Sequence, residues 1–206
     1  MNIHLYLIMR VRDENKKNAI CKAALEIIVK KGFDGLSMQK LAKAAEVSPA
    51  TIYIYFKDRE DLILQLGIQE SRKMVDATLH DFDPEMDFTE GMRLQWKNRA
   101  AYWLKNPVAA QFLEQVKHTP YGEQAYEYTK KEFSNTMGVF VKKAVENGQM
   151  VKLSTEVFWA IAFAPLYTLI KFHLAGKGMH NPNFKLDDKI LDQALNLVLK
   201  ALTPTP

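Results

Sequence analysis

The sequence predicts an all-α protein of about nine helices, and three observations support that fold class. Apolar residues recur at helical spacing along most of the 206 residues. Several of these stretches begin with a side chain that caps helix N-termini, such as Ser48, Asp58, Asp87 and Ser154. The sequence contains no alternating strand pattern, internal repeat or low-complexity tract. With 48% apolar residues, the chain suits one large or two small packed domains.

The first predicted helix covers residues 13–31 and ends at Gly32, the usual type of helix-ending residue. Apolar residues at helical spacing form its inward face: Ile20, Ala24, Ile27 and Ile28. The preceding segment, MNIHLYLIMR, lacks the basic start and the small-residue cleavage site of a signal peptide. We expect this segment to form an ordered arm on the first domain, unless Met9 is the native start and the first eight residues precede it.

Residues 37–62, SMQKLAKAAEVSPATIYIYFKDREDL, predict two short helices joined by a tight corner. Leu41 and Ala45 lie four residues apart on one face of the first of these helices. Ala42 is small enough to let the second helix approach closely, and Val47 fills the angle between the two. This layout is that of a helix-turn-helix, which places its second helix in the DNA major groove.

The second of these helices is predicted to start at Ser48 and Pro49, a hydroxyl N-cap followed by proline at the first helical position. Ile52 and Tyr55 form its inward face. The outward residues are almost uncharged, whereas a solvated helix normally carries charges there. The candidate DNA-contacting residues are this outward face, its N-cap and the flanking phosphate partners: Ser37, Lys40, Ser48, Pro49, Ala50, Thr51, Tyr53, Ile54 and Lys57.

The stretch from about Ile20 to Leu64 resembles the N-terminal domain of the TetR family of bacterial transcriptional regulators. The resemblance rests on AALEIIVKKGFDGLSM followed by LAKAAEVSPATIYIYFKDREDL, in which a helix, a KGF turn, the two-helix motif and the YFKDREDL exit occur in order. It implies a three-helix DNA-binding domain in residues 1–57. It implies a helical domain in residues 58–206 that binds a small-molecule effector and forms a homodimer. The family's default is a repressor that the effector releases from operator DNA.

Two residues depart from the family's pattern. Glu46 stands in the corner where glycine is usual, and a positive φ there would cost glutamate about 1 kcal/mol relative to glycine. Ile54 stands where the family often has a polar or aromatic residue. Its side chain is suited to contact a thymine methyl group, unless it packs on Ile28 or Leu62 instead.

Positive charge is concentrated in the N-terminal part of the chain. Residues 1–57 contain 10 Lys and Arg against 5 Asp and Glu, whereas the rest contains 18 against 19. Counterion release from DNA requires such a basic face. Arg10, Arg12, Lys16 and Lys17 are expected either to contact phosphates or to form a solvated helix start.

The compartment is predicted to be the cytoplasm, without a membrane partner. The single Cys21 allows no internal disulfide, which fits a reducing environment. No apolar run reaches about 18 residues, the length of a membrane span. The most apolar run, VFWAIAFAPLYTLI, has 14 residues and contains Pro165, so it fits a buried helix better.

Six further helices are predicted after the DNA-binding segment, each from a cap or a break. They cover about 58–81, 87–105, 107–119, 121–146, 154–175 and 187–202. The last two carry apolar faces wider than one core stripe requires, and such width indicates burial on two sides. A two-fold four-helix bundle with two helices from each subunit would bury them, and the family resemblance places the dimer interface there. The alternative is deep burial within one subunit.

An effector site is predicted among the aromatic residues of the C-terminal region, although side chains of this kind are usually plain core. The candidate ligand-binding residues are Trp96, Arg99, Trp103, Phe112, Tyr126, Phe133, Met137, Phe163 and Tyr167. Arg99 is expected either to anchor an anionic group of the effector or to form a surface ion pair. Two isolated histidines, His118 and His173, do not make a metal site, and no cofactor is expected.

Two other classes of function remain open at this point. An enzyme is disfavoured because the sequence contains no nucleophile elbow, no phosphate-binding glycine loop and no metal-ligand cluster. A protein-interaction adaptor without DNA binding is disfavoured by Tyr53, Lys57 and the basic N-terminal surplus.

Overall fold

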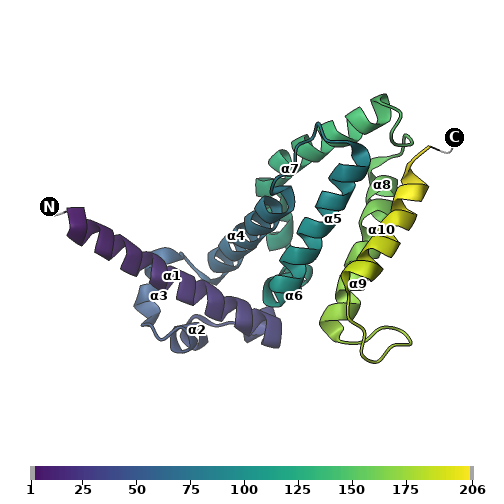
Figure 1. The fold of residues 1–206 in the computed structure, drawn as a ribbon. Helices are drawn as coiled ribbons and strands as arrows, with labels where there is room; N and C mark the ends of the chain where they lie inside the picture. Colours follow the sequence, from purple (N-terminus) through teal and green to yellow (C-terminus); the bar gives the residue numbers. More distant parts are fainter. Residues whose placement is uncertain (1–2, 205–206) are drawn as a thin grey trace. The chain divides into compact units, whose positions relative to one another are not determined.

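The structure is a computed structural model that describes the backbone of residues 3–204 and the side chains of residues 14–131 and 133–204. All regular secondary structure in the described part is helical and none of it is strand, which confirms the predicted all-α class (Figure 1). Its ten α-helices are α1 (Ile3–Lys31), α2 (Met38–Ala44), α3 (Pro49–Tyr55), α4 (Arg59–Leu79), α5 (Phe88–Lys105), α6 (Pro107–Val116), α7 (Pro120–Glu146), α8 (Thr155–Ala162), α9 (Ala164–Ala175) and α10 (Asp188–Leu202). A short 3-10 turn, η1 (Phe33–Gly35), follows α1.

Side-chain caps define most helix starts where the sequence predicted them. The Asp58 carboxylate accepts a hydrogen bond from the backbone N–H of Asp61 at the start of α4. Asp87 and Asp187 do the same for the first turns of α5 and α10, and Ser154 for α8. These caps satisfy backbone N–H groups that have no partner inside the helix.

The start of α1 was predicted wrongly. The helix begins at Ile3, ten residues before the expected start at Asp13. No proline or glycine precedes Gly32, so nothing in the backbone chemistry ends the helix earlier in that direction. The packing of the N-terminal arm and the phosphate contacts of Arg10 and Arg12 concern side chains outside the described residues.

The predicted helix from Ser154 to Ala175 is in fact two helices. α8 ends at Ala162 and α9 begins at Ala164, with Phe163 between them at φ −129° and ψ −22°. Pro165 has no N–H to donate, and its ring would clash with the carbonyl group four residues earlier in a continuous helix. The sequence contained this signal, but the apolar run around it was interpreted as one helix.

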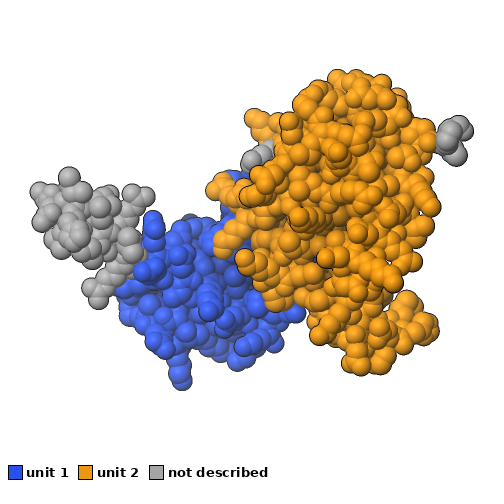
Figure 2. All heavy atoms as spheres, viewed as in Figure 1, with its two compact units in different colours: residues 1–71, 108–128 blue, residues 72–107, 129–206 orange. Residues whose placement is uncertain are grey.

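The chain divides into two compact units, which Figure 2 shows in different colours. Unit 1 contains residues 1–71 and 108–128, and unit 2 contains residues 72–107 and 129–206. α4 and α7 each contribute to both units. The division reflects contacts within the fold, and the functional boundary expected after Lys57 stays a prediction.

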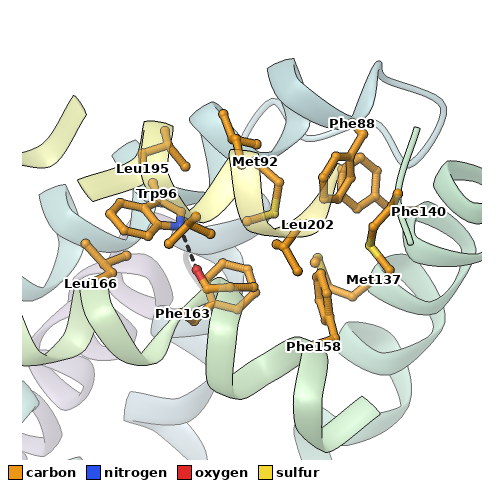
Figure 3. Close-up of a cluster of buried hydrophobic side chains, with 14 of the residues drawn as sticks. Phe88, Met92, Trp96, Met137, Phe140, Phe158, Phe163, Leu166, Leu195 and Leu202 are labelled. Atoms are coloured by element: carbon orange, nitrogen blue, oxygen red, sulfur yellow. Dashed lines mark hydrogen bonds between the residues drawn. The ribbon is translucent and has the colours of Figure 1, made fainter. Parts of the chain in front are cut away.

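Unit 2 has a hydrophobic core built mainly from α5, α7, α8, α9 and α10 (Figure 3). The rings of Phe88 and Phe140 stack with centroids 5.7 Å apart. Gly91 allows this packing, because a Cβ atom at that position would lie 2.5 Å from the Phe140 ring. The dashed line in Figure 3 marks the hydrogen bond that the Trp96 indole donates to the backbone carbonyl of Ala162. α5 is thereby held against the end of α8.

Candidate DNA-binding face and effector site

The corner between α2 and α3 has the geometry predicted for a helix-turn-helix. Ser37 caps α2 by accepting from the Lys40 N–H, and Ser48 caps α3 by accepting from the Thr51 N–H at 3.1 Å. Glu46 in the corner has φ 55°, in the left-handed region. A non-glycine residue there costs about 1 kcal/mol.

The inward faces of the two helices are largely as expected. Leu41, Ala42 and Ile52 are buried, together with Ile20 and Ile28 of α1. Tyr55, also predicted to face inward, is half-buried. These apolar contacts fix α3 on the rest of unit 1 without using any of its outward side chains.

The outward face of α3 is exposed. Tyr53 and Ile54 have 54% and 74% of their surface accessible, although both are large and apolar. The exposure of Ile54 excludes the alternative in which it packs on Ile28 or Leu62. Of the nine candidate residues, Ser37 and Thr51 are half-buried, and the other seven are exposed: Lys40, Ser48, Pro49, Ala50, Tyr53, Ile54 and Lys57. The face is therefore accessible, and its contact with DNA stays a prediction.

Two exposed cations flank this face. Lys40 lies on α2, and Lys57 lies just after α3. Neither forms an ion pair with any side chain among the described residues. Their charges are therefore not neutralised within the described part of the chain, as phosphate contacts require.

Arg59 is a supporting residue that sequence reasoning missed. Its guanidinium donates hydrogen bonds to the backbone carbonyls of Leu36 at 3.0 Å and Phe33 at 2.5 Å. These bonds fasten the start of α4 to the turn before α2. An arginine just inside a helix gives no local sequence signal for partners 23 and 26 residues away.

The nine predicted effector residues are divided between the units. Phe112 and Tyr126 belong to unit 1, where Phe112 is fully buried and Tyr126 is exposed. The other seven belong to unit 2: Trp96, Arg99, Trp103, Phe133, Met137, Phe163 and Tyr167. Trp96 and Met137 lie in the hydrophobic core.

Arg99 is the chemically unusual residue of this group. Only 2% of its surface is exposed, so the alternative of a surface ion pair was wrong. Its guanidinium carbon lies 4.2 Å from the ring centroid of Phe163, 5.4 Å from Phe133 and 5.6 Å from Trp159. Burial lowers the pKa of Arg99 from its ordinary value, and the Tyr167 side chain opposes part of that shift. The Nε and Nη2 atoms have no hydrogen-bond partner among the described residues.

His118 belongs to unit 1 and His173 to unit 2. His118 is exposed, and His173 accepts a hydrogen bond through Nδ1 from the Leu186 N–H at 3.0 Å. Within the described residues, no group of three or more His, Cys, Asp or Glu side chains is placed to hold a metal ion.

Taken together, the capped two-helix corner and the exposed outward face of α3 define a helix-turn-helix protein. Comparison with known proteins agrees. Residues 20–66 match the family model described as bacterial regulatory proteins, tetR family. An uncharacterized HTH-type transcriptional regulator of Haemophilus influenzae is 26% identical over 194 residues, which cover 94% of this chain and 99% of that protein.

Solved structures extend the similarity over nearly the whole chain. A TetR family transcription regulator from Marinobacter aquaeolei superposes with a TM-score of 0.82 at 28% identity, covering 95% of this chain and 100% of that one. A putative TetR family regulator from Vibrio parahaemolyticus gives 0.76 at 27% identity, covering 92% and 100%. Residues 20–66 therefore form a DNA-binding domain of the TetR family type, and the chain as a whole has the fold of the TetR family regulators named above. It is a DNA-binding transcriptional regulator and not an enzyme.

Proposed function

We propose that this protein is a cytoplasmic homodimeric repressor that a small apolar or amphipathic effector releases from operator DNA. The exposed face of α3 is the observation that carries the DNA-binding part of the proposal. Tyr53 and Ile54 remain accessible at the end of a helix whose other side is buried. The nine candidate residues on and around this helix would then supply base contacts in the middle and phosphate contacts at the edges.

The proposed dimer interface is the surface of α8, α9 and α10, which are the last two predicted helices as the structure divides them. By length and composition alone, the stretch Thr155–Leu174 could cross a membrane. It is not one continuous helix, however, because α8 ends before Phe163. Only 28% of its apolar window is buried within the chain. Leu197 on α10 is 62% exposed, and Val157 on α8 is exposed as well. A second copy of the chain would cover these residues in a four-helix bundle.

The proposed coupling follows from the path of α4. Three residues separate the end of α3 from the start of this helix, and its residues 72–79 belong to unit 2. An effector bound in unit 2 that displaces this part of α4 would move its first turn and hence α3. Two recognition helices must lie about 34–36 Å apart to enter successive major grooves, so a small displacement disfavours DNA binding.

The test is a gel-shift titration of the purified protein with the DNA upstream of its own gene. We expect a sequence-preferring complex that weakens steeply with salt, because phosphate neutralisation releases counterions. Footprinting should then show two protected half-sites about one helical turn apart. A protein that dimerises but forms no such complex at any salt concentration would instead support the adaptor without DNA binding.

A further inference from the structure

Four buried polar atoms on one stripe of α5 have no hydrogen-bond partner among the described residues. They are Gln95 Oε1, Arg99 Nε, Arg99 Nη2 and Trp103 Nε1. The three residues are spaced four apart on one helix, so their side chains follow one another along the same face. Buried polar groups in folded proteins are normally paired, so several unpaired groups in a row require an explanation.

The charge of Arg99 makes this arrangement specific for an anion. An arginine side chain stays protonated in proteins, so its positive charge is buried here. The described residues place no carboxylate within ion-pair distance of it. The Tyr167 side chain hydrogen-bonds the guanidinium, and aromatic rings offset part of the cost of burying the cation. Neither interaction pairs Nε or Nη2.

The unpaired edge of the buried guanidinium has the hydrogen-bonding geometry that a carboxylate requires. The rings of Phe133, Trp159 and Phe163 lie within 4.2–5.6 Å of the guanidinium carbon. The N–H bonds of Nε and Nη2 point in parallel from one edge of the planar group. That edge donates two parallel hydrogen bonds to the two oxygens of a carboxylate, the strongest pairing available to arginine.

We propose that the effector is a monocarboxylate with an apolar body, bound side-on by Arg99 and packed against the three aromatic rings. This inference rests on the proposed function, because it gives the chemical class of the effector assumed there. Arg99 is the only buried cation among the described side chains. It therefore balances one negative charge, and a dianion such as a phosphate monoester would keep an unpaired charge in an apolar site.

The neighbouring residues refine the chemistry. The Gln95 Nε2 group donates to the Thr78 carbonyl at 3.0 Å, which leaves Oε1 as an acceptor. Trp103 Nε1, one turn beyond Arg99 on the other side, is a donor. A hydroxyl group close to the carboxylate would satisfy Gln95, and a further acceptor on the effector would satisfy Trp103. Carboxylates with a neighbouring hydroxyl should therefore bind more tightly than their unsubstituted analogues.

The experiment measures binding to the full-length dimer by calorimetry and by the shift of the melting temperature. The probes are benzoate, salicylate, 4-phenylbutyrate, octanoate and palmitate, each compared with its neutral amide. We expect at least one carboxylate to bind, and its amide to bind about 10–100-fold more weakly, because the charge-assisted hydrogen bonds are lost. Failure of every carboxylate to bind, or equal affinity for acid and amide, would overturn the proposal.

The variants are Arg99→Met, Arg99→Lys and the control Arg93→Met. Arg93 lies on the same helix but is exposed and pairs with Asn196 and Asp192. Arg99→Met should abolish carboxylate binding while the helical circular-dichroism signal and the melting temperature do not fall. Arg99→Lys should retain weak binding, because lysine keeps the positive charge but cannot donate two parallel hydrogen bonds from one planar edge. Unchanged affinity in Arg99→Met, or a loss in Arg93→Met alone, would contradict the assignment.

The proposal and the proposed function can fail separately. If neutral molecules release the wild-type protein from its upstream DNA and carboxylates do not, the repressor stands and the carboxylate site is wrong. If no DNA complex forms at all, calorimetry still decides whether Arg99 binds carboxylates.

Discussion

The indole nitrogen of Trp96 donates a 2.8 Å hydrogen bond to the carbonyl oxygen of Ala162, the last residue of α8. The helical structure breaks directly afterwards, at Phe163, and Pro165 lies in the first turn of α9. A helix end leaves carbonyl groups without an intrahelical donor. Trp96 supplies a donor to one of them from α5, so its polar atom is engaged in the core. Its predicted contact with an effector stays a prediction.

Replacing Trp96 with phenylalanine should destabilise the protein. The variant keeps an aromatic ring but leaves the buried Ala162 carbonyl unpaired, which costs about 1–3 kcal/mol in the free energy of unfolding. Urea titration followed by circular dichroism measures the change. Trp103→Phe is the matched control, because its Nε1 has no partner among the described residues and its ring is half-buried. An equal loss in both variants would show that the hydrogen bond contributes nothing.

Replacing Glu46 with glycine should stabilise the protein. The residue has φ 55°, where glycine avoids a steric cost that every other side chain pays. We expect the free energy of unfolding to rise by about 0.5–1 kcal/mol. Glu46→Ala is the control, since alanine keeps the cost and should leave stability nearly unchanged. A gain of the same size with alanine would point to the charge of Glu46 rather than to its backbone.

Replacing Tyr53 or Lys57 with alanine should weaken binding to operator DNA without unfolding the protein. Both side chains are exposed, so neither contributes to the core. Tyr53→Ala should cost about 1–2 kcal/mol of binding free energy, and Lys57→Ala should reduce the salt slope by about 1. Gel shifts at several salt concentrations measure both effects, with Lys105→Ala on α5 as a control. Full operator affinity in both variants would mean that another surface reads the DNA.

Replacing Ile54 with alanine should relax sequence preference rather than reduce affinity for all DNA. A contact with a thymine methyl group discriminates at one base pair, and its loss costs about 1 kcal/mol there. Binding to a library of operator variants gives the preference at each position. An unchanged profile would assign Ile54 no role in base recognition.

Replacing Leu197 with aspartate should weaken the proposed dimer. The side chain lies on the proposed interface of α10, where a second copy would bury the new charge without a partner. Analytical ultracentrifugation should show monomer at concentrations where the wild type is dimeric. Met179→Asp is the control, because Met179 is 82% exposed in the loop after α9, outside that interface. Dissociation caused by Met179→Asp alone would move the interface to the loop.

Local rules predicted the helix-turn-helix and most helix boundaries. Ser48 with Pro49, and the aspartates at 58, 87 and 187, cap their own helices and need no distant partner. The break between α8 and α9 at Phe163 also has a local cause, which is Pro165. The carbonyl group of Ala162 that the break leaves without a helical partner is paired by Trp96 of α5, a distant residue. Propensity alone does not say which helices tolerate a proline.

The candidate effector site was predicted less well, for a physical reason. A lone arginine is expected at the surface, because burying its charge is unfavourable. The burial of Arg99 results from three rings on α7, α8 and the residue between α8 and α9, whose approach is decided by tertiary packing. The carbonyl partners of Arg59 could not be predicted either, because tertiary packing brings them to the arginine from 23 and 26 residues away.

The separation of buried and exposed side chains on α3 has an evolutionary consequence. Ile52 lies entirely in the core, whereas Tyr53 and Ile54 project from it. In the proposed binding mode, mutations at the projecting positions would change which operator is preferred while folding stays intact. We therefore expect new target genes to be acquired through substitutions that cost the scaffold little.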